Sequence, residues 1–253
     1  MSSHEAPATD AVGARGGALD GRTALVTGAS RGIGLAIASA FVREGARVAM
    51  VARSAELLEA RAAELGARAI AVSADVSTRD DLARMAAHAV QHFGGAPDII
   101  VNNAGSFTIA AIESIDPDVF IRSLETNLVG PFLVTRMFLP EMRARGSGHI
   151  VSIGSVADRS AFAGNGAYSP PKFGLRALHE VLRAELRGSG VRTSLISPGP
   201  TDTPLWDALD PDSRPGFTPR RQMLRAGDVA EAVLFAVTRP ERVAVDELRL
   251  SPA

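Results

Sequence analysis

The chain has 253 residues, of which 46% are hydrophobic and 22% charged, an ordinary composition for a globular protein with a sizeable core. Its formal net charge of -1 provides no overall basic field, so we expect neither nucleic acid nor a membrane surface as a partner. It contains no cysteine, which excludes disulfides, thiol nucleophiles and thiolate metal sites.

The first residues are small and polar and lack the apolar segment of a signal peptide. No apolar run approaches the roughly 20 residues of a membrane helix. We therefore expect a disordered tail at residues 1–19, a single domain at residues 20–253 and a cytoplasmic location.

Short apolar runs alternate with helical patterns along the rest of the chain. The predicted strands are Thr23–Thr27, Arg47–Ala52, Ala67–Ser73, Asp98–Val101, His149–Ile153, Val191–Ile196 and Val243–Leu250. The predicted helices are Ile33–Glu44, Ala55–Leu65, Asp80–Phe93, Pro117–Arg145, Pro170–Arg187 and Asp228–Val237. This alternation predicts an α/β fold with a doubly wound, mostly parallel sheet covered by helices on both faces. Such sheets bind ligands beyond the carboxyl ends of their strands.

A glycine-rich turn, TGASRGIG at residues 27–34, joins the first predicted strand to the first helix. Gly28, Gly32 and Gly34 remove side chains where backbone would approach a pyrophosphate, and the helix start presents free N–H groups to that anion. The spacing is GxxxGxG rather than the broader GxGxxG fingerprint. A tight turn without any ligand would also need glycine, so the motif gains weight only from those downstream.

The second predicted strand is followed by Arg53, and no carboxylate stands at its end. An acidic residue at that position would bind the adenosine 2′-hydroxyl and repel a 2′-phosphate. Arg53 and Arg31 of the glycine turn can instead hold a phosphate by charge-assisted hydrogen bonds. The pattern favours NADP(H) over NAD(H), the alternative being two solvated surface arginines.

Tyr168 and Lys172, in the segment YSPPK, are spaced to lie one turn apart on the same side of a helix. Proline is tolerated only in a first turn, so Pro170 and Pro171 predict that the helix begins around Tyr168. The nearby ammonium and the helix N-terminus are expected to lower the pKa of the phenol and suit it to proton transfer. Alone, this spacing also fits an ordinary helix with a half-buried tyrosine.

Three further polar positions follow or interrupt predicted elements. Ser155 comes after a strand and could polarise a substrate oxygen, whereas the absence of a GxSxG elbow disfavours Ser-His-Asp catalysis. Residues 102–105, Asn-Asn-Ala-Gly, close another strand, where small side chains would let a cofactor lie close. Asn127 stands just before Gly130-Pro131 inside the long predicted helix, which indicates a kink there.

Taken together and in order, these motifs resemble those of the short-chain dehydrogenase/reductase family, in its single-domain NADP-linked branch. The resemblance covers residues 20–253 and rests on TGASRGIG, NNAG, Asn127, Ser155, YSPPK and the segment PGPTDT at residues 198–203. It implies a Rossmann-type fold of about seven parallel strands. It also implies a homotetramer, with a dimer as the alternative.

The resemblance implies a role for each matching residue. Tyr168 would be the general acid/base, Ser155 would hold the substrate oxygen, Lys172 would bind the nicotinamide ribose, and Asn127 would anchor a water of a proton relay. The implied cofactor-binding residues are Thr27, Gly28, Ser30, Arg31, Gly32, Ile33, Gly34, Arg53, Asp75, Val76, Asn103, Ala104, Gly105, Tyr168, Lys172, Pro198, Gly199, Thr201 and Thr203.

These observations predict an NADP(H)-dependent carbonyl reductase or alcohol dehydrogenase acting on a small or medium-sized molecule. One alternative is a 3-oxoacyl reductase acting on an acyl carrier protein, but the family's two basic docking positions fall at Leu133 and Ser189, and neither is basic. The other is a catalytically silent NADP-binding regulator, which would typically lack the tyrosine or the lysine.

Two remaining signals have competing interpretations. His88 and His92 have metal-pair spacing on one helix, but no third ligand is nearby, so we expect a solvated surface and no metal site. Trp206, the only tryptophan, is expected either to line a pocket or simply to pack. The residues expected to choose the substrate, around Phe107, 157–164 and 200–217, are apolar or flexible.

Overall fold

The computed structural model describes residues 16–253, so most of the predicted tail lies outside the described residues. The sequence prediction assigned residues 16–19 to that tail, and the structure corrects this assignment. Leu19 is 3% exposed and belongs to the main apolar core, and its N–H donates to the Glu44 carbonyl at 2.8 Å. The folded domain therefore begins before residue 20, because this leucine has an apolar surface to cover.

A seven-stranded, fully parallel sheet forms the centre of the molecule, with the strand order β3-β2-β1-β4-β5-β6-β9. The strands are β1 (Thr23–Thr27), β2 (Arg47–Ala52), β3 (Ala69–Ser73), β4 (Ile99–Asn102), β5 (Gly148–Ile153), β6 (Val191–Pro198) and β9 (Glu247–Leu250). The order reverses between β1 and β4, which is where a doubly wound sheet opens its ligand crevice. The predicted doubly wound α/β fold is confirmed.

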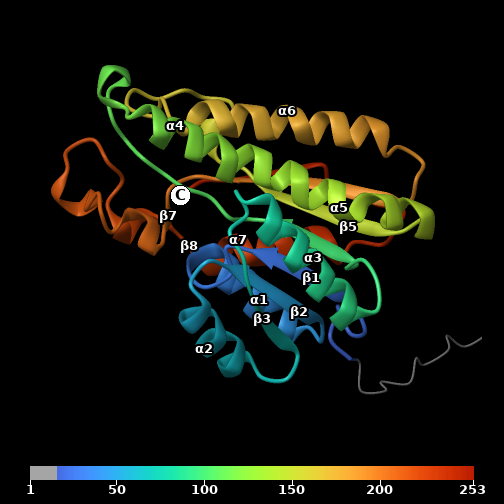
Figure 1. The fold of residues 1–253 in the computed structure, drawn as a ribbon. Helices are drawn as coiled ribbons and strands as arrows, with labels where there is room; N and C mark the ends of the chain where they lie inside the picture. Colours follow the sequence, from blue (N-terminus) through green and yellow to red (C-terminus); the bar gives the residue numbers. More distant parts are fainter. Residues whose placement is uncertain (1–15) are drawn as a thin grey trace, which may run out of the picture.

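Helices cover both faces of this sheet (Figure 1). They are α1 (Gly32–Arg43), α2 (Ala55–Leu65), α3 (Arg79–Phe93), α4 (Pro117–Leu124), α5 (Gly130–Arg145), α6 (Ser169–Glu185) and α7 (Ala226–Val237). Side chains of α1, α2 and α7 pack in one apolar core, and side chains of α3, α5 and α6 pack in the other. A small two-stranded sheet of β7 (Thr201–Asp202) and β8 (Leu224–Arg225) lies in the connection between β6 and α7.

The predicted helix at residues 117–145 is broken into α4 and α5 by a π-helical turn at Glu125–Val129. The Asn127 side chain donates to the Ser123 carbonyl at 3.0 Å, which competes with the regular backbone pattern. Gly130 follows where a Cβ would lie 2.9 Å from the Val76 carbonyl oxygen. The expected kink is therefore present, in the form of a π turn.

The last strand is shorter than predicted, because β9 begins only at Glu247. The Val243 N–H instead donates to the Pro240 carbonyl in a turn, and the Val245 carbonyl accepts from the Ser194 hydroxyl at 2.6 Å. These bonds satisfy the backbone before β9 begins.

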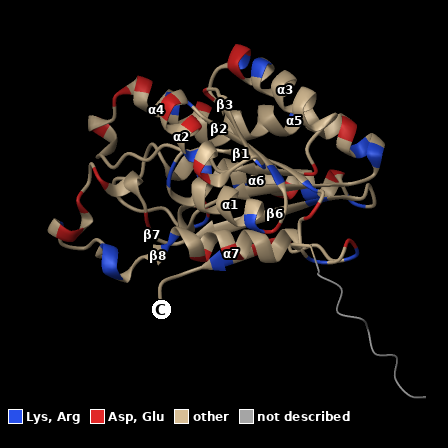
Figure 2. Ribbon diagram, turned by 90° about the horizontal axis from the view of Figure 1, so that it is seen from below, with Lys and Arg blue, Asp and Glu red and all other residues tan. Residues whose placement is uncertain are grey.

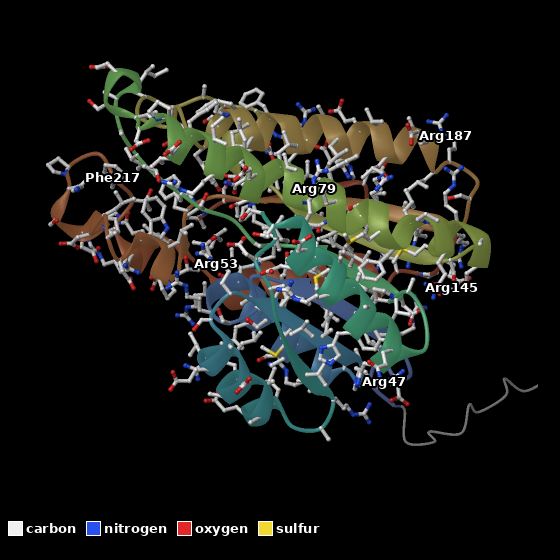
Figure 3. The ribbon with its side chains drawn as sticks, viewed as in Figure 1. Arg47, Arg53, Arg79, Arg145, Arg187 and Phe217 are labelled. Carbon is white, nitrogen blue, oxygen red and sulfur yellow. The ribbon has the colours of Figure 1, made fainter. Side chains whose placement is uncertain are left out.

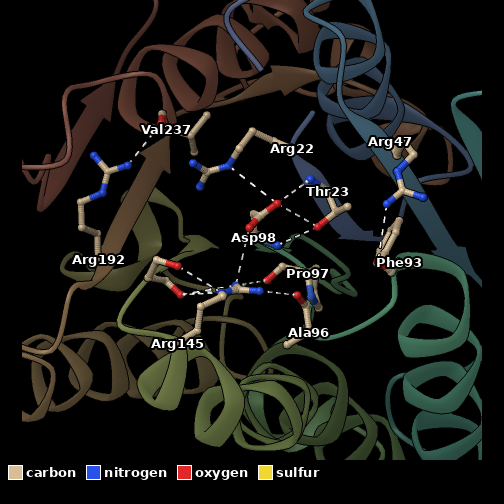
Figure 4. Close-up of polar contacts among 11 residues, drawn as sticks. Arg22, Thr23, Arg47, Phe93, Ala96, Pro97, Asp98, Arg145, Arg192 and Val237 are labelled. Carbon is tan, nitrogen blue, oxygen red and sulfur yellow. Dashed lines mark hydrogen bonds and ion pairs between the residues drawn. The ribbon is translucent and has the colours of Figure 1, made fainter. Parts of the chain in front are cut away.

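Asp98 organises the opposite, amino edge of the sheet (Figure 4). Its carboxylate accepts from the N–H of Thr23 at 2.8 Å and pairs with both Arg22 and Arg145 at 3.7 Å. Arg145 also donates to the Ala96 carbonyl at 2.9 Å. These contacts tie the ends of β1, β4 and α5 together, so the open crevice lies at the other edge.

Acidic and basic segments are mixed along the outer helices and loops in Figure 2, consistent with the small net charge. In the described part of the chain, every helix is too short or too polar to span a bilayer.

Candidate active site

A cleft of about 950 Å³ opens at the carboxyl edge of the sheet. It is lined by the glycine turn, the ends of β2, β4, β5 and β6, the start of α6 and the segment 200–218. The predicted site residues that line it are Gly28, Ser30, Arg31, Gly32, Ile33, Arg53, Asp75, Val76, Asn103, Ala104, Gly105, Asn127, Ser155, Tyr168, Lys172, Pro198, Gly199, Thr201 and Thr203. Elements far apart in the sequence thus converge on one cavity.

Thr27 and Gly34, the two remaining predicted residues, do not line the cleft but pack beneath the residues that do. The Thr27 hydroxyl accepts from the N–H groups of Asn103 and Ala104, both at 3.0 Å. A Cβ on Gly34 would lie 2.3 Å from the Gly28 carbonyl oxygen. Both residues therefore set the shape of the turn.

The glycine turn is packed directly on the segment that follows β4. Gly28 has φ +68, and a Cβ there would lie 2.8 Å from the Ala104 Cα. The Asn103 amide donates to the Thr27 carbonyl at 2.8 Å. This close packing leaves the backbone surface before α1 bare of side chains, which is the surface that a pyrophosphate needs.

Two arginines border the same end of the cleft. The Arg53 side chain is 78% exposed, and its guanidinium lies 3.8 Å from the Asp75 carboxylate. Arg31 is exposed within the glycine turn. In Figure 3, Arg53 and Phe217 both lie toward the left side of the view. Both guanidiniums are thus accessible to an anionic group that enters the cleft.

Tyr168 is the residue directly before the first turn of α6, as the double proline predicts. Pro170 and Pro171 occupy the first turn, where no helical hydrogen bond requires their missing N–H groups. Lys172 is 5% exposed, and its Nζ donates to the Ile153 carbonyl at 2.9 Å and lies 5.6 Å from the Tyr168 ring centroid. The helix register therefore brings phenol and ammonium together next to β5.

The sequence-based expectation that the pKa of Tyr168 is lowered is wrong. Burial raises the pKa of the phenol to about 12, the neighbouring Ser155 hydroxyl lowers it, and the Asp158 carboxylate raises it further. Burial also lowers the pKa of Lys172 to about 8, with Asp158 acting in the opposite direction. Desolvation disfavours the charged form of each group and outweighs the local charges.

Asp158 is a site residue that the motifs above do not predict. It is fully buried, and one carboxylate oxygen accepts from the Ser155 N–H at 3.2 Å and from the Ser197 hydroxyl at 2.5 Å. The Ser155 hydroxyl in turn accepts from the Ala157 N–H at 3.1 Å, which leaves its proton to be donated elsewhere. The Ser-x-x-Asp spacing of residues 155–158 is a capping-box signature and could have indicated this role.

Asn127 lies in the π turn with its side chain against the cleft. Its amide nitrogen donates to the Ser106 carbonyl at 3.1 Å and to the Ser123 carbonyl at 3.0 Å. Its amide oxygen is buried and accepts no hydrogen bond from the described residues, and a Cβ on Gly105 would lie 2.8 Å from it. The Asn127 amide oxygen is therefore an available acceptor beside residues 103–105.

The structure also shows where Trp206 and the histidine pair lie. Trp206 lines the cleft, which supports the pocket interpretation over simple packing. His92 packs edge-on against Phe93 with ring centroids 5.4 Å apart. Within residues 16–253, no group of three or more histidine, cysteine or acidic side chains is arranged to hold a metal ion.

Comparison with known proteins identifies the family. The family model for short chain dehydrogenases matches residues 22–214. A glycine betaine reductase of Emericella nidulans is 36% identical over 242 residues, which is 93% of this chain but only 19% of that much longer protein.

Two solved structures have nearly the same length as this chain. A metagenomic short-chain oxidoreductase in complex with NADP shares 32% identity, with a TM-score of 0.80 over 93% of this chain and 99% of its own. A 3-ketoacyl-(acyl-carrier-protein) reductase from Brucella melitensis in complex with NADH shares 29% identity, with a TM-score of 0.82 over 93% of this chain and 98% of its own. The chain therefore belongs to the short-chain dehydrogenase/reductase family of oxidoreductases.

Proposed function

We propose that this protein transfers a hydride between NADP(H) and the carbonyl or secondary alcohol carbon of a small or medium-sized substrate, with Tyr168 as the general acid/base. The observation that carries this proposal is the meeting of Tyr168, Lys172 and Ser155, from two separate elements, in the cleft that also contains the glycine turn. The relatives bound to NADP or NADH support the use of a nicotinamide cofactor.

The residues present fit such a cofactor. The bare backbone before α1 would hold the pyrophosphate, Asp75 and Val76 the adenine, and Pro198, Gly199, Thr201 and Thr203 the nicotinamide side. Lys172 uses one ammonium hydrogen on Ile153 and keeps two donors for ribose hydroxyls. When bound, the nicotinamide would supply or accept the hydride.

The chain's own groups would handle the proton. In reduction, the Tyr168 hydroxyl donates its proton to the carbonyl oxygen, while Ser155 donates a hydrogen bond to the same oxygen. The Lys172 ammonium then stabilises the phenolate, whose formation burial otherwise opposes. The free Asn127 oxygen can hold a water that returns a proton to the site.

Tyr168→Phe tests the assignment of the acid. The change removes only the hydroxyl, so the fold and NADPH affinity should be unchanged, whereas turnover should fall by about 10²–10⁴-fold. Carbonyl reduction is followed as NADPH oxidation, and NADPH affinity by fluorescence titration of the same preparations. Near wild-type turnover in the variant would assign the proton to another group.

Arg53→Asp tests the preference for NADP(H). The wild-type protein should bind NADPH much more tightly than NADH, because Arg53 and Arg31 pair with the 2′-phosphate. The variant should reverse that order, since a carboxylate repels the phosphate and accepts from a free 2′-hydroxyl. Arg187→Asp, just beyond the C-terminal end of α6 in Figure 3, makes the same change in net charge and should leave the order intact. Equal wild-type affinities would contradict the preference.

A substrate panel separates the alternatives. Activity confined to 3-oxoacyl groups on an acyl carrier protein would identify the carrier-linked reductase. NADPH binding without turnover of any carbonyl compound would identify the silent regulator.

A further inference from the structure

A row of four aromatic rings extends outward from the catalytic phenol. Phe107 packs edge-on against Tyr168 with centroids 4.8 Å apart, and Trp206 packs edge-on against Phe107 at 5.1 Å. Phe217 continues the row at 6.3 Å from Trp206. All four residues line the cleft, and Figure 3 shows Phe217 on the outlying segment of this edge.

The polar atom of Trp206 is already satisfied. Its indole N–H donates to the Thr201 carbonyl at 3.1 Å, so the ring offers hydrocarbon rather than a donor to the cleft. A fifth aromatic side chain, Phe162, also lines the cleft and is 51% exposed. Exposed aromatic surface of this kind is stabilised when another apolar group covers it.

Arg220 holds the ring-bearing segment in place. Its guanidinium pairs with Asp202 and with Asp207, both at 2.6 Å, and its backbone N–H donates to Asp212 at 2.9 Å. These bonds close the loop that carries Trp206 and Phe217. They also occupy the guanidinium with two carboxylates, so Arg220 is not available to bind an anionic substrate.

Four charged residues line the cleft, and three of them, Arg31, Arg53 and Asp75, lie on the cofactor side. The fourth, Lys172, lies at the inner end of the aromatic row, with its ammonium 5.6 Å from the Tyr168 ring centroid, and the lining residues around the other three rings are uncharged. Arg214 precedes the lining residue Pro215 but does not itself line the cavity. An anionic substrate group among the outer rings would therefore lose its hydration without gaining a counter-charge. A carboxylate on the reacting carbon would meet only the Lys172 ammonium, which already donates to Ile153 and whose other two donors serve the cofactor ribose in the proposed function.

We propose that the row Tyr168–Phe107–Trp206–Phe217 is the substrate subsite and that it selects uncharged carbonyl compounds carrying an aromatic group next to the reacting carbon. The inference rests on the proposed function and names the substrate class for it. The aryl group stacks on the ring row while the carbonyl oxygen faces Tyr168 and Ser155.

Three α-keto compounds test charge and aromaticity separately. Ethyl benzoylformate is neutral and aromatic, benzoylformate is the same ketone as a carboxylate, and ethyl pyruvate is neutral without the ring. With NADPH, kcat/KM for ethyl benzoylformate should exceed that of ethyl pyruvate by about tenfold or more, since burial of a phenyl group alone favours binding to that extent. It should exceed that of benzoylformate by about tenfold or more as well, since the carboxylate must lose its hydration in the cleft. Equal values, or a preference for the carboxylate, would overturn the proposal.

Phe217→Ala tests the row itself. The variant should raise KM for ethyl benzoylformate several-fold and leave KM for ethyl pyruvate unchanged. Phe235→Ala removes an exposed aromatic ring of α7 that does not line the cleft, and should change neither value. An equal effect of Phe217→Ala on both esters would mean that the ring does not contact the aryl group.

Binding measured without turnover separates this inference from the proposed function. Trp206 is the only tryptophan in the chain, so its emission reports on this subsite. In the presence of NADP⁺, ethyl benzoylformate should change that emission at concentrations about tenfold below those required by benzoylformate. This order without any turnover would support the subsite and refute the reductase assignment. Turnover of ketones with the reverse order, or no response to either compound, would refute the subsite.

Discussion

Asp158 connects the acidity of the Tyr168 phenol to the placement of Ser155. Its carboxylate is completely buried and accepts hydrogen bonds from Ser155 and Ser197. Its other oxygen pairs with Arg159 at 2.9 Å, and Arg159 continues to Glu247 of β9 at 3.1 Å. A negative charge is thus held behind the site, where it opposes formation of the phenolate. In the proposed function Asp158 would act through Ser155 and Tyr168, as a positioning residue.

Asp158→Asn should move the pH dependence of the reaction. Asparagine keeps the shape and can still accept from Ser155, but it removes the charge that raises the pKa of Tyr168. The phenolate becomes easier to form, so the rising, acidic limb of the kcat/KM profile for alcohol oxidation should shift to lower pH by about one unit. Steady-state rates across a pH series, with NADP⁺ as oxidant, measure this limb.

Ser197→Ala is the matched control for that experiment. It removes one hydrogen bond to Asp158 but retains the carboxylate, so it should lower Tm without moving the pH limb. If the two variants lower Tm alike and neither moves the limb, Asp158 is only structural.

At the scale of single residues, sequence patterns locate the site better than they describe its energetics. Tyr168 and Lys172 lie together as their spacing predicts, and the tolerated double proline follows from its place in the first turn. Their pKa shifts could not be predicted, because desolvation depends on how much protein from other elements surrounds each group.

At the scale of elements, sequence periodicity predicts that a helix or strand exists better than it predicts where that element begins and ends. The strand–helix alternation predicts the seven strands of the sheet, whereas the π turn at Glu125–Val129 and the late start of β9 depend on side chains that bond to backbone. The segment 200–225 is less predictable still. Its short elements are held by Arg220 and three acidic residues, a set of contacts without any periodic signature.

At the scale of the whole molecule, one helical surface has no cover within the described chain. Phe173, Ala177 and Val181 recur every four residues on α6, which places them on one side, and all three are exposed. Phe132 of α5, a helix packed on the same face of the sheet, is 46% exposed. Large exposed apolar surfaces of this kind mark protein–protein contacts.

We therefore propose that the protein self-associates through this surface of α6, in the homotetramer or dimer implied by its family resemblance. Light scattering coupled to size exclusion should give a mass of two or four chains. Phe173→Glu combined with Val181→Glu should lower that mass, because burying the introduced carboxylates against a second copy costs more than the lost apolar contact alone. Val90→Glu, on the exposed side of α3, should leave the mass unchanged. A monomeric wild-type protein, or a double variant that keeps the wild-type mass, would show that α6 does not form the contact, and its apolar stripe would then need another partner.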